Sequence, residues 1–150
     1  LWDLVRSTCL AAVAVMLASC ASVYERDFEA ETARFTAPAR GPEGPWKGEW
    51  RSEMNGHHGP LWCMIGEPES APGTHDFRYR AGWGVLEFGD YTHRAATRRE
   101  KDGSLVFEGA MDLPGDVGRF DVEGRVTAER FDARFRSDRG DHGTMVLTRP

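Results

Sequence analysis

The sequence is poor in cysteine and has no long hydrophobic run. Only one of its three cysteines, Cys63, lies beyond the first 20 residues, so no disulfide can form within that larger part of the chain. Cys63 stands in the apolar stretch LWCMIG, which predicts a buried thiol rather than a reactive one. The apolar run near the beginning, Cys9 to Leu17, has nine residues. A helix that spans a bilayer needs about 20, so this run is too short.

Basic charge and catalytic motifs are also scarce. The chain has 24 acidic and 19 basic residues, a formal net charge of −5 at pH 7, and only two lysines, Lys47 and Lys101. Proteins that bind nucleic acids present basic surfaces, so this balance argues against such a partner. The sequence contains no P-loop, no GxSxG and no HExxH. It therefore indicates no catalytic residue, no metal and no cofactor, and we expect a protein that is not an enzyme.

The first 20 residues have the layout of a secretory signal. Arg6 supplies the positive charge, the apolar run follows, and small residues come next. The sequence LASC, which ends at Cys20, resembles the lipobox of bacterial lipoproteins, in which a branched residue and two small residues precede the cysteine. The resemblance implies removal of residues 1–19 and acylation of Cys20, for instance with palmitate. A plain signal peptide with a chance cysteine is the alternative.

A lipid on Cys20 would make the membrane a partner of this chain, because two or three acyl chains form a firm anchor. Ala21 follows the cysteine. In the sorting rule of enteric bacteria, an aspartate at that position favours retention in the inner membrane. We therefore expect the protein in the cell envelope, on the outer membrane facing the periplasm if the cell has one.

Residues 20–44 have the composition of a lipid-anchored tether. The stretch YERDFEAETARF places Tyr24, Phe28 and Phe35 loosely on one side of a short helix that would be marginal alone. The stretch TAPARGPEGP then packs three prolines and two glycines into ten residues, which ends any helix. The predicted organisation is a signal peptide at 1–19, a partly helical tether at 20–44 and a β-domain at 45–150.

From Trp46 onward, apolar and charged residues alternate with a period of two, which is typical of strands with one dry and one wet face. Turn sequences rich in glycine, proline and aspartate separate these strands, and the less regular stretch 83–99 predicts a bend or bulge near Gly84 and Gly89. About eight short-linked strands predict an antiparallel meander. An apolar sheet face must be covered or closed, and no other element is long enough to cover it. The sequence therefore predicts a small closed β-barrel with charged outer faces, unlike the apolar lipid face of a membrane barrel.

The opening GPWKGEW resembles the Gly-X-Trp start of the calycins, the superfamily of lipocalins and fatty-acid-binding proteins. The resemblance implies that a tryptophan of the first strand packs under an arginine of the last one, so Trp46, Trp50 and Arg149 are the candidates for closing the barrel. More narrowly, GxWxGxWxSExNGHHGxLxC and DHGTMxLTRP resemble a group of bacterial lipoproteins known only as uncharacterised. This second resemblance implies no activity.

The stretches NGHHGP and RGDHG bring four polar candidates to one end of such a barrel. The last strand begins where the first one ends, so His57, His58, Asp141 and His142 are expected at the same mouth. They can form a structural turn network, contact a polar ligand or partner, or hold a metal ion. His75 and His93 share the inward parity of their strands, which indicates hydrogen-bonded core residues or, alternatively, a haem ligand.

Small residues on the predicted inner faces leave two interiors open. Large aromatic neighbours can fill the barrel, or a cavity of at least about 300 Å³ can remain for a ligand. The leading hypothesis is non-catalytic binding of a small apolar or amphipathic molecule. The alternatives are a protein-interaction module, such as an inhibitor of an envelope enzyme, and a metal-dependent enzyme.

Overall fold

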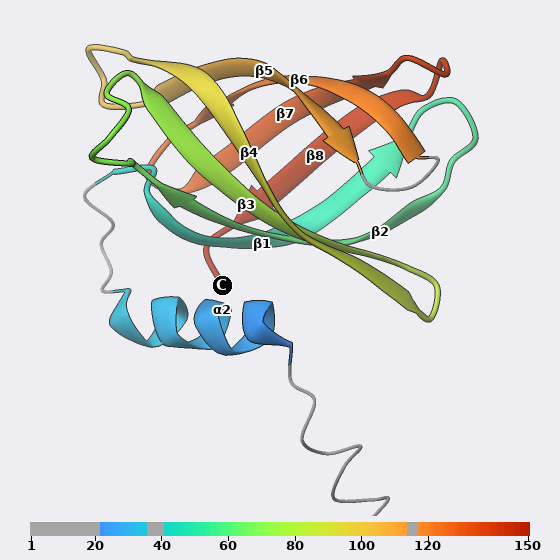
Figure 1. Ribbon diagram of the computed structural model, residues 1–150, viewed down its shortest axis with the longest axis horizontal. Coiled ribbons are helices and arrows are strands. Elements are labelled where there is room, and N and C mark those ends of the chain that lie inside the picture. Colours follow the sequence, from blue (N-terminus) through green and yellow to red (C-terminus); the bar gives the residue numbers. More distant parts are fainter. Residues whose placement is uncertain (1–21, 36–40, 114–116) are drawn as a thin grey trace, which may run out of the picture.

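The computed structural model describes residues 22–35, 41–113 and 117–150, which form one helix and a barrel of eight strands (Figure 1). The predicted signal peptide and Cys20 lie outside the described residues. The elements are α2 (Val23–Arg34), β1 (Gly44–Ser52), β2 (His58–Gly66), β3 (Thr74–Trp83), β4 (Leu86–Arg99), β5 (Leu105–Leu113), β6 (Gly118–Val126), β7 (Arg130–Ser137) and β8 (His142–Thr148).

Each strand pairs antiparallel with the next one in the chain, and β1 pairs with β8 to close the barrel. Trp50 of β1 lies opposite Met145 of β8. The residues with apolar parity in the sequence face the interior: Phe77, Phe107 and Phe131 are each at most 2% exposed. The prediction of a small, closed, antiparallel eight-stranded barrel is confirmed.

The predicted bulge near Gly89 is also confirmed. The register between β3 and β4 shifts beside Tyr79, and Asp90 adopts a φ of 126° that is uncommon for a residue with a side chain. Both oxygens of Asp90 accept hydrogen bonds from Arg78, at 2.6 and 2.7 Å, which holds the bulge. Beyond it the β3–β4 hairpin projects from the barrel (Figure 1).

One end of the interior is filled by aromatic side chains. The rings of Phe77 and Phe107 stack at 4.3 Å between centroids, and Phe131 lies 5.6 Å from Phe107. Trp46, which is fully buried, packs on Phe131 at 6.1 Å. These four side chains pack against one another across this end of the barrel.

Arg149 seals the filled end. Its guanidinium lies 3.8 Å from the ring centroid of Trp46, a cation–π distance, and the indole Nε1 donates to the carbonyl of Pro42 at 2.9 Å. Burial lowers the pKa of Arg149 to about 10, an effect that Glu43 partly offsets, so the group stays charged at neutral pH. The guanidinium also donates to the backbone carbonyls of Gly41, Pro45 and Ala128, at 2.6, 3.1 and 3.0 Å.

Helix α2 packs against the outside of the barrel. It begins with a capping box, in which the backbone N–H of Glu25 donates to Ser22 Oγ and the N–H of Ser22 donates to the Glu25 carboxylate. Tyr24 is 1% exposed, and its hydroxyl donates to the carbonyl of Arg78 on β3 at 3.1 Å. Burial of Tyr24 thus fixes a helix that would be marginal alone. Among the described residues, no helix combines the length and the apolar character needed to cross a bilayer.

Candidate functional site

The two ends of the barrel differ in kind. The turns after β2, β4 and β6 surround the filled end that Arg149 seals. The turns after β1, β3, β5 and β7 surround the other end, which we call the mouth. Because successive strands run in opposite directions, both predicted histidine-containing turns lie at the mouth.

The turns β1–β2 and β7–β8 are joined to one another. Ser52, which is 1% exposed, donates from its hydroxyl to Asp141 Oδ1 at 2.5 Å. The same hydroxyl oxygen accepts hydrogen bonds from the backbone N–H groups of Met54 and Asn55, at 3.2 and 3.3 Å. The N–H of Glu53 donates to the carbonyl of His142 at 2.8 Å. The hydroxyl of Ser52 therefore serves to tie the two turns together.

The histidines of these turns do not converge. His57 lies against the ring of Trp83 with 4.9 Å between centroids. His58 is exposed at the start of β2, and the Nδ1 of His142 lies 3.2 Å from the carbonyl of Gly140. In the described part of the chain, no three groups drawn from His57, His58, Asp141 and His142 lie close enough together to share a metal ion. A role for these four residues in binding a ligand or partner stays a prediction.

An apolar pocket of about 200 Å³ opens at the mouth. The pocket reaches into the barrel from the mouth, which is the end opposite to the aromatic side chains at the filled end. Asp141 is the only charged residue in its lining. The pocket is smaller than the cavity of about 300 Å³ expected for a drug-sized ligand. Its apolar walls include Trp50, Leu61, Ala81, Met111, Phe120 and Met145.

Tyr91 in the lining of the pocket, and the side chains of Tyr79 and Cys63 next to it, carry no charge at neutral pH. Tyr91 lines the pocket and packs on Tyr79, with 6.0 Å between ring centroids, and Tyr79 pairs with Cys63 across β2 and β3. Burial raises the pKa of each of these three groups, so they remain protonated. The arrangement is therefore suited to an apolar chain, with a polar group only at the rim beside Asp141.

His93 is a buried polar residue whose state the sequence did not reveal. It is 2% exposed on β4, and neither ring nitrogen has a hydrogen-bond partner in the protein. Its neighbours are apolar: the ring of Phe77 lies 6.4 Å away, and a Cβ added to Gly109 would stand 2.5 Å from its Nε2. Burial lowers the pKa of His93, so the folded protein holds it neutral.

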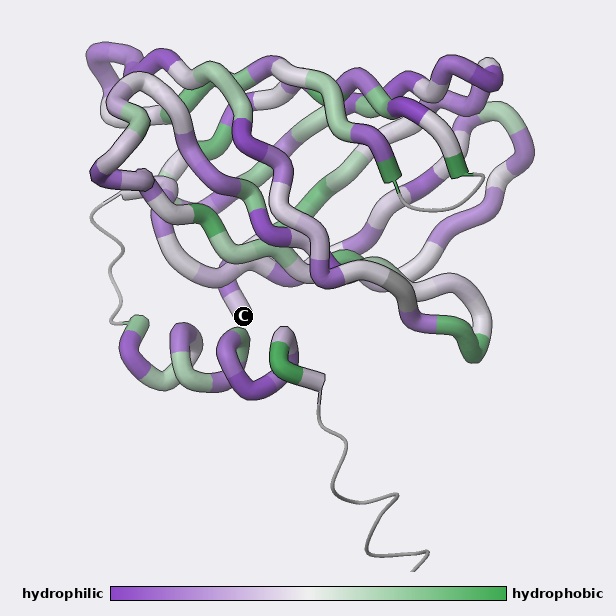
Figure 2. Tube along the Cα trace, in the orientation of Figure 1, coloured by the Kyte–Doolittle hydropathy of each residue, from purple (hydrophilic) through white to green (hydrophobic). Residues whose placement is uncertain are grey.

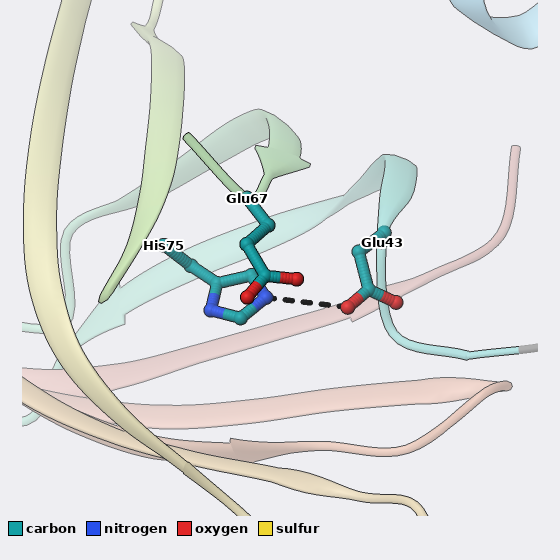
Figure 3. A group of neighbouring side chains, drawn as sticks. All are labelled: Glu43, Glu67 and His75. Carbon is teal, nitrogen blue, oxygen red and sulfur yellow. Dashed lines mark hydrogen bonds and ion pairs between the residues drawn. The ribbon is translucent and has the colours of Figure 1, made fainter. Parts of the chain in front are cut away.

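His75, the other inward histidine, belongs to a polar cluster at the filled end (Figure 3). Its Nδ1 lies 2.8 Å from Thr97 Oγ1 and its Nε2 lies 3.2 Å from Glu43. One oxygen of Glu43, one of Glu67 and a ring nitrogen of His75 lie within 4.8 Å of one another, as metal ligands would. Sequence reasoning missed this group because both glutamates come from irregular segments with no strand parity.

The cluster is better explained as a clamp than as a metal centre. Glu43 pairs with Arg99, so a cation would have to displace that guanidinium. Burial opposes ionisation of Glu43, but hydrogen bonds from Arg99, from its own backbone and from His75 outweigh it and lower its pKa. Both nitrogens of His75 are already engaged. These contacts attach the segment before β1 to β3 and β4.

Comparison of the chain with protein-family models, with curated proteins and with solved structures finds no match. The likeness to calycins and to bacterial lipoproteins accordingly stays at the level of the quoted motifs.

Proposed function

We propose that this protein is a lipid-anchored protein of the cell envelope that binds the apolar end of a small amphipathic molecule, without catalysis, in the pocket at the mouth. The observation that carries the proposal is the apolar pocket of about 200 Å³ at the mouth of the barrel, with Asp141 as its charged lining residue. The anchor on Cys20 rests on the lipobox motif and on the signal that precedes it. The expected location is the outer membrane, facing the periplasm, where the cell has one.

The size and charge of the pocket indicate the ligand class. If a methylene group occupies about as much space as a water molecule, roughly 30 Å³, the pocket holds about seven of them. Asp141 at the rim disfavours an anionic head group beside it. The expected ligand therefore has a short alkyl chain, or the end of a longer one, below a neutral or cationic head.

A chain-length series tests this proposal. The affinity of n-alkyl glucosides, measured by calorimetry below their micelle concentrations, should rise about fourfold for each added methylene, because each buried CH₂ contributes about 0.8 kcal/mol. The rise should level off near seven carbons, when the pocket is full. An affinity that is independent of chain length would show that the pocket does not take the chain. A rise without a plateau would indicate adsorption to an outer surface.

A matched pair of variants locates the binding. Ala81 lines the pocket, so Ala81→Leu places three extra carbons in it, and octyl glucoside should bind about 60-fold more weakly, since about three methylenes are displaced. Ala96→Leu adds the same carbons on the exposed outer side of β4 and should leave the affinity unchanged. Equal binding by both variants would place the ligand elsewhere.

A further inference from the structure

Large hydrophobic side chains that face water are concentrated at the mouth. In the described ranges, six such side chains are exposed, and five of them belong to the turns at the mouth or to their flanks. The sixth, Val23, stands at the beginning of α2. Scattered exposed apolar residues need no explanation, but a group at one end of a molecule indicates a binding surface. The five are Met54, Trp83, Val85, Leu86 and Val117.

The tip of the β3–β4 hairpin is the most prominent part of this group. Residues 83–86, which we call the apolar tip, read WGVL at a position where turns usually carry polar residues. Val85 is fully exposed, and Leu86 is 60% exposed. Figure 2 shows the hydrophobic end of this hairpin projecting beyond the rest of the barrel. No described element of the chain covers Val85.

The beginning of α2 is fastened to the strand that leads into the apolar tip. Arg80 of β3 donates to Ser22 Oγ, pairs with Glu25 at 3.4 Å, and also pairs with Glu87 of β4. One turn further along the helix, Asp27 pairs with Arg78 at 2.7 Å. The N-terminal end of α2 therefore points to the same side of the molecule as the apolar tip (Figure 1).

The chain that enters α2 arrives from Cys20, two residues before Ser22. Two residues of extended chain span at most about 7 Å. The strand from Arg80 to Trp83 extends about 10 Å along the hairpin, and the turn that holds Val85 lies beyond it. A bilayer that held acyl chains on Cys20 would therefore lie within about 7 Å of Ser22, and the hairpin is long enough for the apolar tip to reach such a bilayer on its own side of the molecule.

We propose that the apolar tip inserts into the surface of the bilayer that holds the lipid on Cys20. This proposal rests on the acylation of Cys20 proposed above. Tryptophan favours the membrane–water interface, and Val85 and Leu86 supply the apolar part. The nearby acids do not oppose the contact, since Glu87 is paired with Arg80 and Asp90 with Arg78. The tip would hold the mouth close to the membrane, the source of amphipathic molecules for the pocket.

The test uses the full chain, produced with its signal in a bacterium that processes lipoproteins, and extracted from the membranes. Its intact mass reports whether Cys20 carries acyl chains. The protein is placed in vesicles of equal parts phosphatidylethanolamine and phosphatidylglycerol, with and without bromine on the acyl chains, which quenches nearby tryptophans. The difference between the wild type and Trp83→Phe isolates the emission of Trp83.

We expect most of the Trp83 emission to be lost in the brominated vesicles. Val85→Asp places a charge on the apolar tip and should restore the emission. Val106→Asp makes the same change on the outer side of β5, away from the tip, and should leave the quenching intact. This matched pair separates insertion of the tip from the effect of an added charge.

Three results would overturn the proposal. The first is an acylated chain that floats with the vesicles while Trp83 stays unquenched, which would leave the anchor in place and the tip in water. The second is protection of Trp83 from acrylamide without vesicles, which would mean that a second copy or another protein covers the tip. The third result begins with an intact mass that shows no acyl chain, which would refute the proposed acylation of Cys20. If the unacylated wild type and Val85→Asp then bind vesicles equally, insertion of the apolar tip is refuted as well.

Discussion

Replacement of His93 by leucine should stabilise the protein, although most substitutions in a core are destabilising. Each buried polar group without a hydrogen-bond partner costs about 1–3 kcal/mol, and His93 has two ring nitrogens in this condition. Leucine has no polar atom to desolvate. It differs in shape from the imidazole, which costs up to about 1.5 kcal/mol. The two nitrogens together cost about 2–6 kcal/mol, so the net gain in the free energy of unfolding at pH 7 is about 0.5–6 kcal/mol.

The gain should grow in acid. Burial lowers the pKa of His93 in the folded protein, while the unfolded chain titrates near the usual value of about 6.5. Below that pH the unfolded state binds a proton that the folded state does not, so the contribution of His93 to stability falls as the pH falls. Between pH 7 and pH 5 the wild type should lose at most about 2 kcal/mol more than His93→Leu.

Urea unfolding of the two proteins at pH 7 and at pH 5 measures both effects. His93→Gln is the control, because it keeps a buried donor and acceptor but does not titrate near neutral pH. The free energy of unfolding of His93→Gln should depend on pH as weakly as that of His93→Leu. At pH 7 it should not exceed that of the wild type. If His93→Leu is less stable than the wild type at pH 7 and the two pH profiles are parallel, the reasoning about the unpartnered ring is refuted.

Two further predictions concern the ends of the barrel. Arg149→Lys keeps the charge near Trp46 but loses the fork of donors that reaches three carbonyls, so urea unfolding should show a loss of about 2–3 kcal/mol. An unchanged stability would mean that the seal is not needed. Ser52→Ala removes the hydroxyl that joins the two turns, and should cost about 1–3 kcal/mol and raise amide exchange in residues 53–57. Asp141→Asn can still accept a hydrogen bond from Ser52. The backbone amides of residues 53–57 should therefore exchange more slowly in Asp141→Asn than in Ser52→Ala.

Much of the fold could be predicted because strand formation leaves a local pattern. In the segment from Phe131 to Arg136, apolar and charged residues alternate, and the structure buries Phe131, Ala133 and Phe135 in β7. Glycine near an irregular strand correctly indicated the bulge beside Asp90. Closure followed from the absence of any element long enough to cover an apolar sheet.

The candidate site was only partly predictable. Strand direction alone brought the turn of Ser52 and the turn of Asp141 to one mouth. The direction of each histidine side chain depends on neighbours that are distant in sequence. His57 meets Trp83 from another hairpin, for example. His75 and His93 also show this dependence on distant neighbours. Both face inward, but only His75 has hydrogen-bond partners in the described part of the chain.

The sequence by itself determined that the chain forms strands with one apolar face and where they turn, because these properties depend on residues adjacent in the chain. It also indicated closure, because no other element is long enough to cover the apolar face. It also contains the linear motif around Cys20. Only the tertiary structure decided that the interior is filled at one end and hollow at the mouth, because side-chain volumes there add up across all strands. It likewise decided that α2 docks with its beginning toward the apolar tip, since that depends on Arg78 and Arg80 meeting Asp27 and Ser22.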